Sequence, residues 1–522
     1  MTRPSYGAAE AGSSIRAWVG WLVLPAAILG TLLYPDIHQA TMGTTVAAVL
    51  VAGGIGAVLL TGRTKLLILV VLVAGYLPSA TAGFVAGAVV LFLLALVLGA
   101  RRLATPLTGS DLALLAALAW ACFAWLANLG QETDAWSLPV AMLTFWTPWL
   151  IIFLVRSERW SAQDLGTVRA AWAALIVVQL VPALLKPFIL GHPAAYLVPV
   201  IGLRLAGIPI PDDPAVASLA DFTSGTTTSS HQLGILVLLG MAYFGALYWR
   251  SRRRPMLVVS IVLGLLLLMT DAKHVVLSAV LALVPAAGLL IWPELQRRVR
   301  VTVILASAVV TLGGAALLTT TIVRLARAGL WEPLVAVTSF NPKIQLYART
   351  AALMKPGELH TWIGYGPGAF ASRAASSRAT GALFKEEAKL PSFIPPFTPP
   401  DYGRTVSDLY TANIFATSGN RSDVLTSPFS SLVGIVAEYG VLGTLLVGWF
   451  LVSLVRLGVR TWRRTDSGDG WRAIGAALAF GILLLAVLSC FDSYFEQPVV
   501  AIPIATLWLL ASMAPPVRTQ VS

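Results

Sequence analysis

One acidic residue, Glu438, stands inside a long apolar run, "SSLVGIVAEYGVLGTLLVGWFL". A carboxylate in lipid or in a protein interior costs several kcal/mol unless hydrogen bonds or a cation compensate it. Glu438 is expected about nine residues into its helix, which places it roughly 13 Å below the membrane boundary. It either faces a polar cavity as a functional group or bonds a neighbouring helix as a structural group, and the run alone leaves both interpretations open.

A second group of residues lies in "RTAALMKPGELHTWIGYGPGAF", which contains Arg349, His360 and the glycines Gly364, Gly366 and Gly368. Arg349 falls on an expected helix, a Pro-Gly pair ends that helix, and a Gly-Tyr-Gly-Pro-Gly turn follows. Glycine tolerates positive φ and lets backbone N–H groups approach a ligand closely. The turn therefore either binds substrate or closes a loop helix onto the membrane surface.

A third group is "TDAKHVVL", where Asp271, Lys273 and His274 stand together at a membrane boundary. As a point charge, Lys273 is suited to binding an anionic group such as a phosphate. The alternative is that these side chains extend to the interface and cap a tight turn.

A fourth group is "TTTSSHQLG" at 226–234, which runs from polar residues into the start of a helix. Ser229 or Ser230 can cap that helix by accepting a hydrogen bond from a free N–H group. His231 lies near the same helix end, which also favours an anion. Arg204, in "IGLRLAG", belongs to the same outside loop and could join a substrate-binding site there.

The composition decides which elements must position these residues. The chain has 522 residues, of which 57% are hydrophobic and 11% charged, whereas a soluble domain is roughly 25% charged. The mean hydropathy is +0.80. The net charge is +12, but the basic residues flank apolar runs, so membrane topology explains them and nucleic-acid binding is not expected. Cys122 and Cys490 lie in apolar runs and predict neither a disulfide framework nor a metal site.

Apolar runs of about 20 residues can cross the hydrocarbon core. By that criterion the chain is an all-α polytopic membrane protein with about 14 transmembrane helices. The predicted spans are 17–34, 44–61, 65–80, 83–100, 112–129, 137–155, 166–186, 232–249, 256–271, 275–292, 301–323, 429–455, 473–491 and 498–514.

Clusters of basic residues fall in alternate connections, for example Arg101 and Arg102, "RSRRR" at 250–254 and "RTWRR" at 460–464. The positive-inside rule places those connections and both termini in the cytoplasm. The long connections around 187–231 and 324–428 then lie outside, where long loops without periodicity are often functional.

These predictions divide the chain into membrane blocks and outside loops. The larger loop is expected to be partly helical because it holds amphipathic stretches such as "KIQLYARTAALMK". The predicted divisions are N-terminal transmembrane helices at 1–186, an extracytoplasmic loop at 187–231, central transmembrane helices at 232–323, the large extracytoplasmic loop at 324–428, and C-terminal transmembrane helices with a short cytoplasmic tail at 429–522.

Two of the quoted segments occur in a specific order. "PGELHTWIGYGPGAF" followed by "SSLVGIVAEYGVLGTLL" resembles the large-loop and following-helix signature of the O-antigen ligase / O-antigen polymerase superfamily. "TTSSHQLGILVLL" is similar to a helix-opening stretch of that family, and "TDAKHVVLSA" falls where many members carry Ser-Arg before a helix. The resemblance covers roughly residues 220–455.

The resemblance implies an enzyme in surface polysaccharide assembly at the outer, periplasm-facing side of the bacterial inner membrane. It would transfer or polymerise glycan units from an undecaprenyl-diphosphate-linked donor to a sugar or lipid acceptor, as a polymerase or a ligase. No metal and no other cofactor is implied. The expected partners are the polyprenyl-diphosphate-linked glycan, membrane lipid and other polysaccharide-assembly proteins. Such chemistry needs a base for the acceptor hydroxyl and cations beside the diphosphate leaving group.

The resemblance also implies residue roles. Arg349 matches the loop arginine, and Lys273 stands where a second arginine often lies. The family's His-Asn pair falls on Phe429 and Ser430, so the usual histidine is absent, and His360 is the candidate substitute. The implied catalytic residues are therefore Arg349, Glu438 and His360.

Two other functions stay open on the sequence. Many apolar helices also suit a transporter or flippase of lipid-linked sugars or another anion, although no internal repeat is visible. The missing His-Asn pair is compatible with a non-catalytic scaffold in polysaccharide assembly.

Overall fold

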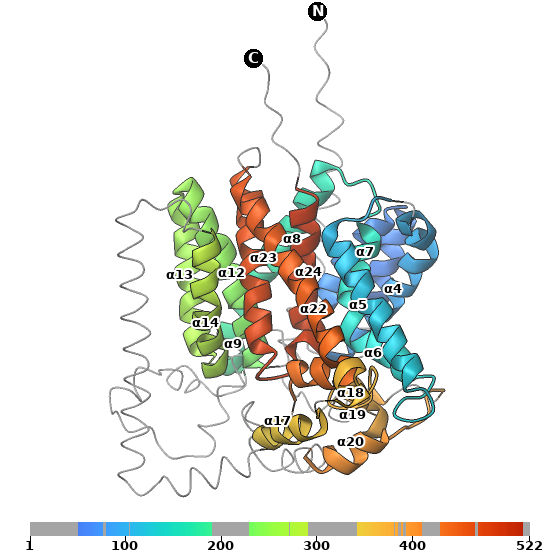
Figure 1. Ribbon diagram of the computed structural model, residues 1–522. Coiled ribbons are helices and arrows are strands. Elements are labelled where there is room, and N and C mark those ends of the chain that lie inside the picture. Colours follow the sequence, from blue (N-terminus) through green and yellow to red (C-terminus); the bar gives the residue numbers. More distant parts are fainter. Residues whose placement is uncertain are drawn as a thin grey trace, which may run out of the picture. The chain divides into compact units, whose positions relative to one another are not determined.

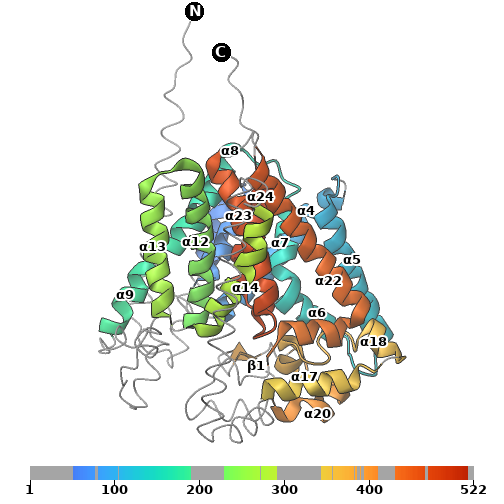
Figure 2. The same cartoon turned by 60° about the vertical axis from the view of Figure 1, so that its left-hand side comes forward.

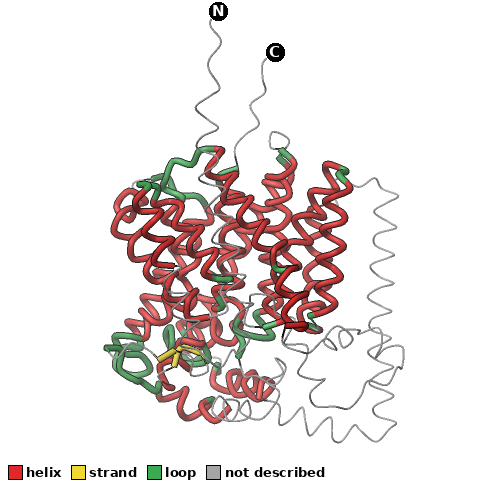
Figure 3. Tube along the Cα trace, turned by 180° about the vertical axis from the view of Figure 1, so that it is seen from behind, coloured by secondary structure: helices red, strands yellow, loops and turns green. Residues whose placement is uncertain are grey.

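The computed structural model describes residues 51–76, 80–103, 105–189, 229–270, 272–290, 342–355, 357–380, 382–384, 388–389, 393–409, 429–464 and 468–514. Most of these residues are helical (Figure 3). The sheet structure among them is one short antiparallel pair, β1 (Ala382–Phe384) with β2 (Ala388–Lys389). The described part of the chain is therefore all-α except for this pair, which the sequence patterns did not indicate.

Seven helices among the described residues are long and apolar enough to cross a membrane. They are Phe84–Arg102, Gly109–Ala127, Ser137–Val155, Ala162–Leu185, Ser230–Ser251, Ser431–Arg463 and Asp469–Leu488. Their length and apolarity confirm the prediction of a helical membrane protein, because a bilayer core offers no water to unpaired backbone groups and admits such helices.

The predicted spans at 17–34 and 301–323 lie outside the described residues. The other predicted spans each overlap a helix, and some of these helices are shorter than a full crossing. The shorter apolar helices are Val51–Leu60, Thr64–Ala74, Arg254–Met269, His274–Leu290 and Pro498–Ser512. The total of fourteen crossings stays a prediction.

The chain folds into two compact units, which differ from the five predicted divisions. The first unit is Met1–Thr105, Thr147–Lys273 and Pro498–Pro515, and the second is Pro106–Trp146, His274–Gln497 and Pro516–Ser522. Neither unit is continuous in sequence, because helices distant along the chain pack together within each of them.

The first unit is a helical bundle. Its elements are η2 (Thr64–Leu66), α3 (Leu67–Ala74), α4 (Ala80–Leu103), α7 (Thr147–Val155), α8 (Ala162–Val178), α9 (Leu180–Ile189), α12 (Ser230–Ser251), α13 (Arg254–Met269) and α24 (Pro498–Ser512). Gly240 on α12 allows close packing, since a Cβ atom there would lie 2.6 Å from Ile176 Cγ2 on α8 and 2.9 Å from Leu263 Cδ1 on α13. Trp172 Nε1 on α8 donates a hydrogen bond to the Pro503 carbonyl on α24 at 3.1 Å.

The second unit combines membrane helices with the described part of the large loop. Its membrane-side elements are α5 (Gly109–Ala127), α6 (Ser137–Ala141), a π-helical turn η3 (Met142–Trp146), most of α14 (Lys273–Leu290), α22 (Ser431–Arg463), α23 (Asp469–Leu488) and the 3₁₀ turn η8 (Tyr494–Glu496). Small residues bring α22 and α23 together. A Cβ atom on Gly458 would lie 2.7 Å from the Gly475 carbonyl oxygen.

The loop part of this unit contains α17 (Pro342–Leu353), α18 (Leu359–Ile363), α19 (Arg373–Thr380) and α20 (Pro400–Thr405). These helices gather at the end of α22 where that helix begins (Figure 1). The core that α17, α19 and α20 share with α22 consists of Leu346, Phe370, Ala371, Ala375, Tyr402, Val406, Leu409, Val433 and Ala437. Each fully buried Leu or Phe contributes about 1.5–3 kcal/mol, so this core anchors the loop to the first turns of α22.

Helix α22 is longer than a membrane crossing needs. Its 33 residues would extend about 50 Å at 1.5 Å per residue, against a hydrocarbon core of about 30 Å. The helix is broken at Gly440, where φ is 65° and ψ is −173°. The part after Gly440 ends with Arg460 and Arg463 and is by itself long enough to cross, so a crossing does not require the turns before Gly440, which carry Glu438.

Candidate functional site

Beside the break in α22 lie three consecutive backbone carbonyl groups, of Ala437, Glu438 and Tyr439, that accept hydrogen bonds from outside the helix. The loop and α5 supply other donors. Tyr365 N donates to the Ala437 oxygen at 2.9 Å and Gly366 N to the Glu438 oxygen at 2.9 Å. Trp120 Nε1 on α5 donates to the Tyr439 oxygen at 2.8 Å. Because a buried unpaired carbonyl is costly, the break is stable only with the loop backbone in place.

We call residues 364–368 the glycine turn. Gly364, Gly366 and Gly368 have φ of 78°, 92° and 74°, which favour glycine. A Cβ atom on Gly364 would lie 2.4 Å from the Glu438 carbonyl, and one on Gly366 would lie 2.6 Å from Thr133 Cγ2. Protein atoms therefore occupy the space beside these glycines. Their contacts assign them to packing the turn into the helix break, and contact with a substrate stays a prediction.

The Glu438 carboxylate is buried and accepts three hydrogen bonds from the loop backbone. Its Oε2 accepts from Gly368 N at 2.7 Å, and its Oε1 accepts from Phe370 N at 3.0 Å and Ser372 N at 3.1 Å. Amide donors on both oxygens oppose the desolvation penalty of the carboxylate. Backbone amides of the loop and the Ser372 hydroxyl are hydrogen-bond donors to this carboxylate. Glu438 thus positions the glycine turn, while its catalytic role stays a prediction.

Arg349 lies on the surface side of α17. Its Nη1 donates to Asp408 Oδ1 at 2.7 Å and to the Thr405 carbonyl at 2.6 Å, and its Nη2 donates to Gln345 Oε1 at 2.9 Å. Burial alone would raise the pKa of Asp408, but the hydrogen bond and charge of Arg349 outweigh it and lower that pKa. Arg349 therefore joins α17 to the segment after α20 and is not among the hydrogen-bond partners of Glu438.

His360 lies on α18 beside Tyr365, with 4.6 Å between the ring centroids. Glu132, in the connection after α5, is close enough for the charge of His360 to affect it. Burial raises the pKa of Glu132, although Asp401 N donates to its Oε2 at 2.9 Å and opposes the rise. His360 therefore has a carboxyl group nearby, but it does not contact Glu438 through any hydrogen bond that the structure shows.

The predicted residues of the smaller loop belong to the first unit or lie outside the described residues. Ser229 caps α12, because its Oγ accepts a hydrogen bond from Gln232 N at 3.3 Å. His231 is in the first turn of that helix. Ser230 Oγ is buried and has no hydrogen-bond partner among the described residues. Lys273 begins α14, but its side chain is outside the described part of the chain, as is Arg204.

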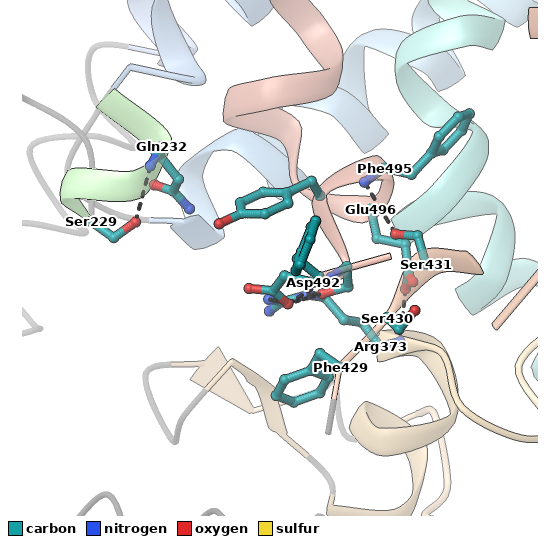
Figure 4. A network of polar contacts seen from close by, with 12 residues as sticks. Ser229, Gln232, Arg373, Phe429, Ser430, Ser431, Asp492, Phe495 and Glu496 are labelled. Atoms are coloured by element: carbon teal, nitrogen blue, oxygen red, sulfur yellow. Dashed lines mark hydrogen bonds and ion pairs between the residues drawn. The ribbon is translucent and has the colours of Figure 1, made fainter. Parts of the chain in front are cut away.

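A second cluster of charges was not predicted from the sequence. Arg373, at the start of α19, donates its backbone N–H to Glu496 Oε2 at 2.7 Å. Its Nε donates to Ser493 Oγ, and its Nη2 lies 3.8 Å from Asp492 Oδ1. Figure 4 shows Arg373 beside Asp492 and Glu496. Asp492 precedes η8, and Glu496 is the last residue of η8. A loop cation thus meets two carboxyl groups from the connection after α23.

Lys343, on α17, brings a second cation to the same region. Its Nζ donates to the carbonyl oxygens of Phe429, at 2.6 Å, and Phe491. The guanidinium of Arg373 lies 4.9 Å from the centre of the Phe429 ring, a cation–π distance. Phe429 stands where the resemblance would place the missing histidine, and here it contacts both cations.

Glu496 has the most altered acidity of this cluster. Burial, and then the negative charge of Glu438, raise the pKa of Glu496 from 4.5 to about 8, while the cation and amide of Arg373 oppose the rise.

Asp492 lies at the edge of the cluster, and its Oδ1 accepts a hydrogen bond from Ser493 N at 2.6 Å. His274 Nε2 and the Tyr494 hydroxyl, both buried, are 2.7 Å apart. The cluster therefore combines cations with two carboxyl groups, and the hydrogen-bonded pair of His274 and Tyr494 lies beside it.

We define the charged cluster as Lys343, Arg373, Asp492, Ser493 and Glu496. The signal that could have revealed it is "FDSYFEQ", which places two acids between two apolar runs. Acidic residues in such a position need partners, but residue spacing cannot identify partners that are more than a hundred positions away in the sequence. Within the described part of the chain, no three His, Cys, Asp or Glu side chains are grouped to hold a metal ion.

Neither the protein-family models nor the curated proteins contain a match to this chain.

Proposed function

We propose that the chain is a membrane glycosyltransferase of the O-antigen polymerase or ligase kind. It would transfer glycan from an undecaprenyl-diphosphate donor to a sugar or lipid acceptor in surface polysaccharide assembly. The observation that carries the proposal is the meeting of Arg373 with Asp492 and Glu496, beside Lys343, which donates to the carbonyl oxygens of Phe429 and Phe491. The two segments that carry the resemblance also fold directly onto each other, as the hydrogen bonds to Glu438 show.

The proposed reaction gives roles to three residues of the charged cluster. The oxygen of the acceptor hydroxyl forms a bond to the anomeric carbon of the donor, and the bond from that carbon to the diphosphate oxygen breaks. Asp492 accepts the hydroxyl proton, and the diphosphate leaves with the electron pair beside Arg373 and Lys343. Asp492 suits this role better than Glu496, because its side chain is 13% exposed and Glu496 is buried at 1%. Fixed cations beside a developing anion are a large catalytic term.

The orientation of the second unit supports a site outside the cytoplasm. The loop packs at the beginning of α22, and Arg460 and Arg463 lie in its last turn. By the positive-inside rule the basic end faces the cytoplasm, so the opposite end and the charged cluster would face the periplasm of a bacterial inner membrane.

The test uses the purified full chain in lipid nanodiscs with a lipid-linked oligosaccharide and an acceptor. Wild-type protein is expected to form a new glycosidic product. Arg373→Ala should lower the rate by about 10²–10³, as expected for a lost charge-stabilising donor, and Arg373→Lys should recover part of it. Arg404→Ala is the matched control, because this arginine of the same loop is 78% exposed.

Arg349→Ala decides between the two arginines. If Arg349→Ala abolishes transfer in a folded protein while Arg373→Ala does not, the charged cluster is the wrong site. If folded wild-type protein forms no bond with any lipid-linked donor and acceptor, the enzyme proposal fails.

Transport is a second candidate because α22 is discontinuous at Gly440, and discontinuous helices are typical of transporters. Movement of the lipid-linked sugar across the bilayer without a new bond would favour it. Normal polysaccharide output with Arg373, Lys343 and Asp492 all replaced would favour a scaffold.

A further inference from the structure

The short loop helix α18 exposes two large apolar side chains on one side. Leu359 is 65% exposed and Trp362 is 50% exposed. They are three residues apart, which places them on the same face of a helix. The other side of α18 is held by the glycine turn, because Gly364 follows the helix directly and packs against Glu438 and Gly440 of α22. The exposed face is therefore rigidly presented.

This face continues an apolar surface of two candidate membrane helices in the same unit. On α5, Phe123 is 49% and Leu126 59% exposed, and on α22, Leu445 is 64% exposed. The glycine turn contacts α5, since a Cβ atom on Gly366 would lie 3.3 Å from the Ala124 carbonyl oxygen. Figure 2 shows α18 beside the adjacent ends of α5 and α22. Three neighbouring helices of this unit thus each carry exposed apolar side chains.

Polar residues border the apolar face of α18. Lys355 and Glu358 precede it and are exposed, and Thr361 Oγ1 donates a hydrogen bond to the Lys355 carbonyl at 2.5 Å. A tryptophan with a leucine on one face, next to a lysine, is the pattern of a helix at a membrane–water boundary. Continuity with the lipid-facing sides of α5 and α22 makes bilayer lipid the occupant that fits.

We propose that α18 is an interfacial lipid anchor, in which Leu359 and Trp362 insert beneath the headgroups of the bilayer leaflet next to the loop. The bilayer thereby supports the short helix that leads into the glycine turn. The loop is held at a set height above the membrane, independently of any reaction the protein performs.

The test places an environment-sensitive fluorophore on single cysteines in a protein with Cys122→Ser and Cys490→Ser. The labelled positions are Trp362→Cys and Leu359→Cys, with Glu358→Cys as the matched control on the polar border. The protein is reconstituted in phosphatidylcholine–phosphatidylglycerol nanodiscs with a nitroxide either near the headgroup or deep in the acyl chain.

Labels at 359 and 362 should be quenched several-fold more by the shallow nitroxide than the label at 358, and should be protected from aqueous iodide. Iodide access equal to that at 358 in both labelled variants overturns the proposal. Protection from iodide without lipid quenching also overturns it and assigns the face to a protein or a second copy of the chain. The fluorescence measurement needs no transfer activity, so it tests the lipid-anchor proposal independently of the proposed function.

Discussion

At the scale of the residue, the molecule separates two kinds of buried acid. Glu438 accepts three backbone hydrogen bonds, so its negative charge has dedicated donors. Glu496 receives the Arg373 amide but is buried near the negative charge of Glu438. The two buried acids of this unit therefore differ in their hydrogen-bond donors, since loop amides reach both oxygens of Glu438 and the Arg373 amide reaches Glu496.

The raised pKa of Glu496 predicts a pH-dependent stability. Between about 4.5 and about 8, the native state holds a proton that the unfolded state has released, so the free energy of unfolding falls as pH rises through this window. Wild-type protein should lose thermal stability from pH 5 to pH 8, and Glu496→Gln should flatten the loss. Thermal unfolding in nanodiscs measures this change of stability with pH. An unchanged slope of stability against pH in Glu496→Gln would contradict the raised pKa of Glu496.

The control for that experiment is Glu358→Gln, on the exposed border of α18. This change should leave the slope of stability against pH as in the wild type. A slope altered equally by both variants would show that the measurement reports net charge and not the buried carboxyl.

At the scale of the element, the helix break in α22 and the glycine turn form one structure. The turn places amide donors against the carbonyl groups that the break exposes, and Glu438 binds the residues that follow the turn. Neither half satisfies its backbone groups alone, so the loop should dock as a cooperative piece rather than residue by residue.

Substitutions of glycine test this dependence. Gly440→Ala and Gly364→Ala each place a methyl group 2.4 Å from backbone atoms of the other segment, at φ and ψ values that are essentially restricted to glycine. The backbone strain alone costs about 1–3 kcal/mol. Limited proteolysis should then cut the loop at a protease concentration that leaves the wild-type loop intact, while the membrane helices persist.

Gly448→Ala provides the matched control in the same helix, because a Cβ atom there meets nothing within 4 Å. Alanine is a better helix former than glycine by about 1 kcal/mol, so this variant should be at least as stable as the wild type. Equal protease resistance of all three variants would show that loop docking does not need the close approach at the break.

At the scale of the whole molecule, the distribution of charge predicts a topology. The loop packs on the first turns of α22, and the last turn of that helix carries basic residues. Single cysteines at Lys355 and at Arg464, in protein without native cysteines, should label with a membrane-impermeant reagent in intact spheroplasts at 355 alone. Labelling at 464 alone would invert the topology and place the charged cluster in the cytoplasm.

Much of the helical framework follows from the sequence. Apolar runs identify the helices because a bilayer requires each crossing segment to satisfy its own backbone, and the described helices overlap the predicted spans. The helix cap at Ser229 could also be predicted, because it depends on neighbours in sequence. The need of Glu438 for compensating bonds could be predicted too, because burying one charge is costly.

The partners of the charged groups were decided by the tertiary structure. Arg349 carried the predicted role, yet its guanidinium pairs with Asp408. The guanidinium of Arg373 lies beside Asp492, and its backbone N–H bonds Glu496, which is 123 positions away in sequence. Glu438 is compensated by amides of a turn 66 to 70 positions earlier. Residue type and local spacing establish that a buried charge needs a partner. Which group fills that need depends on how the loop docks against α22 and η8, a long-range arrangement that local periodicity does not encode.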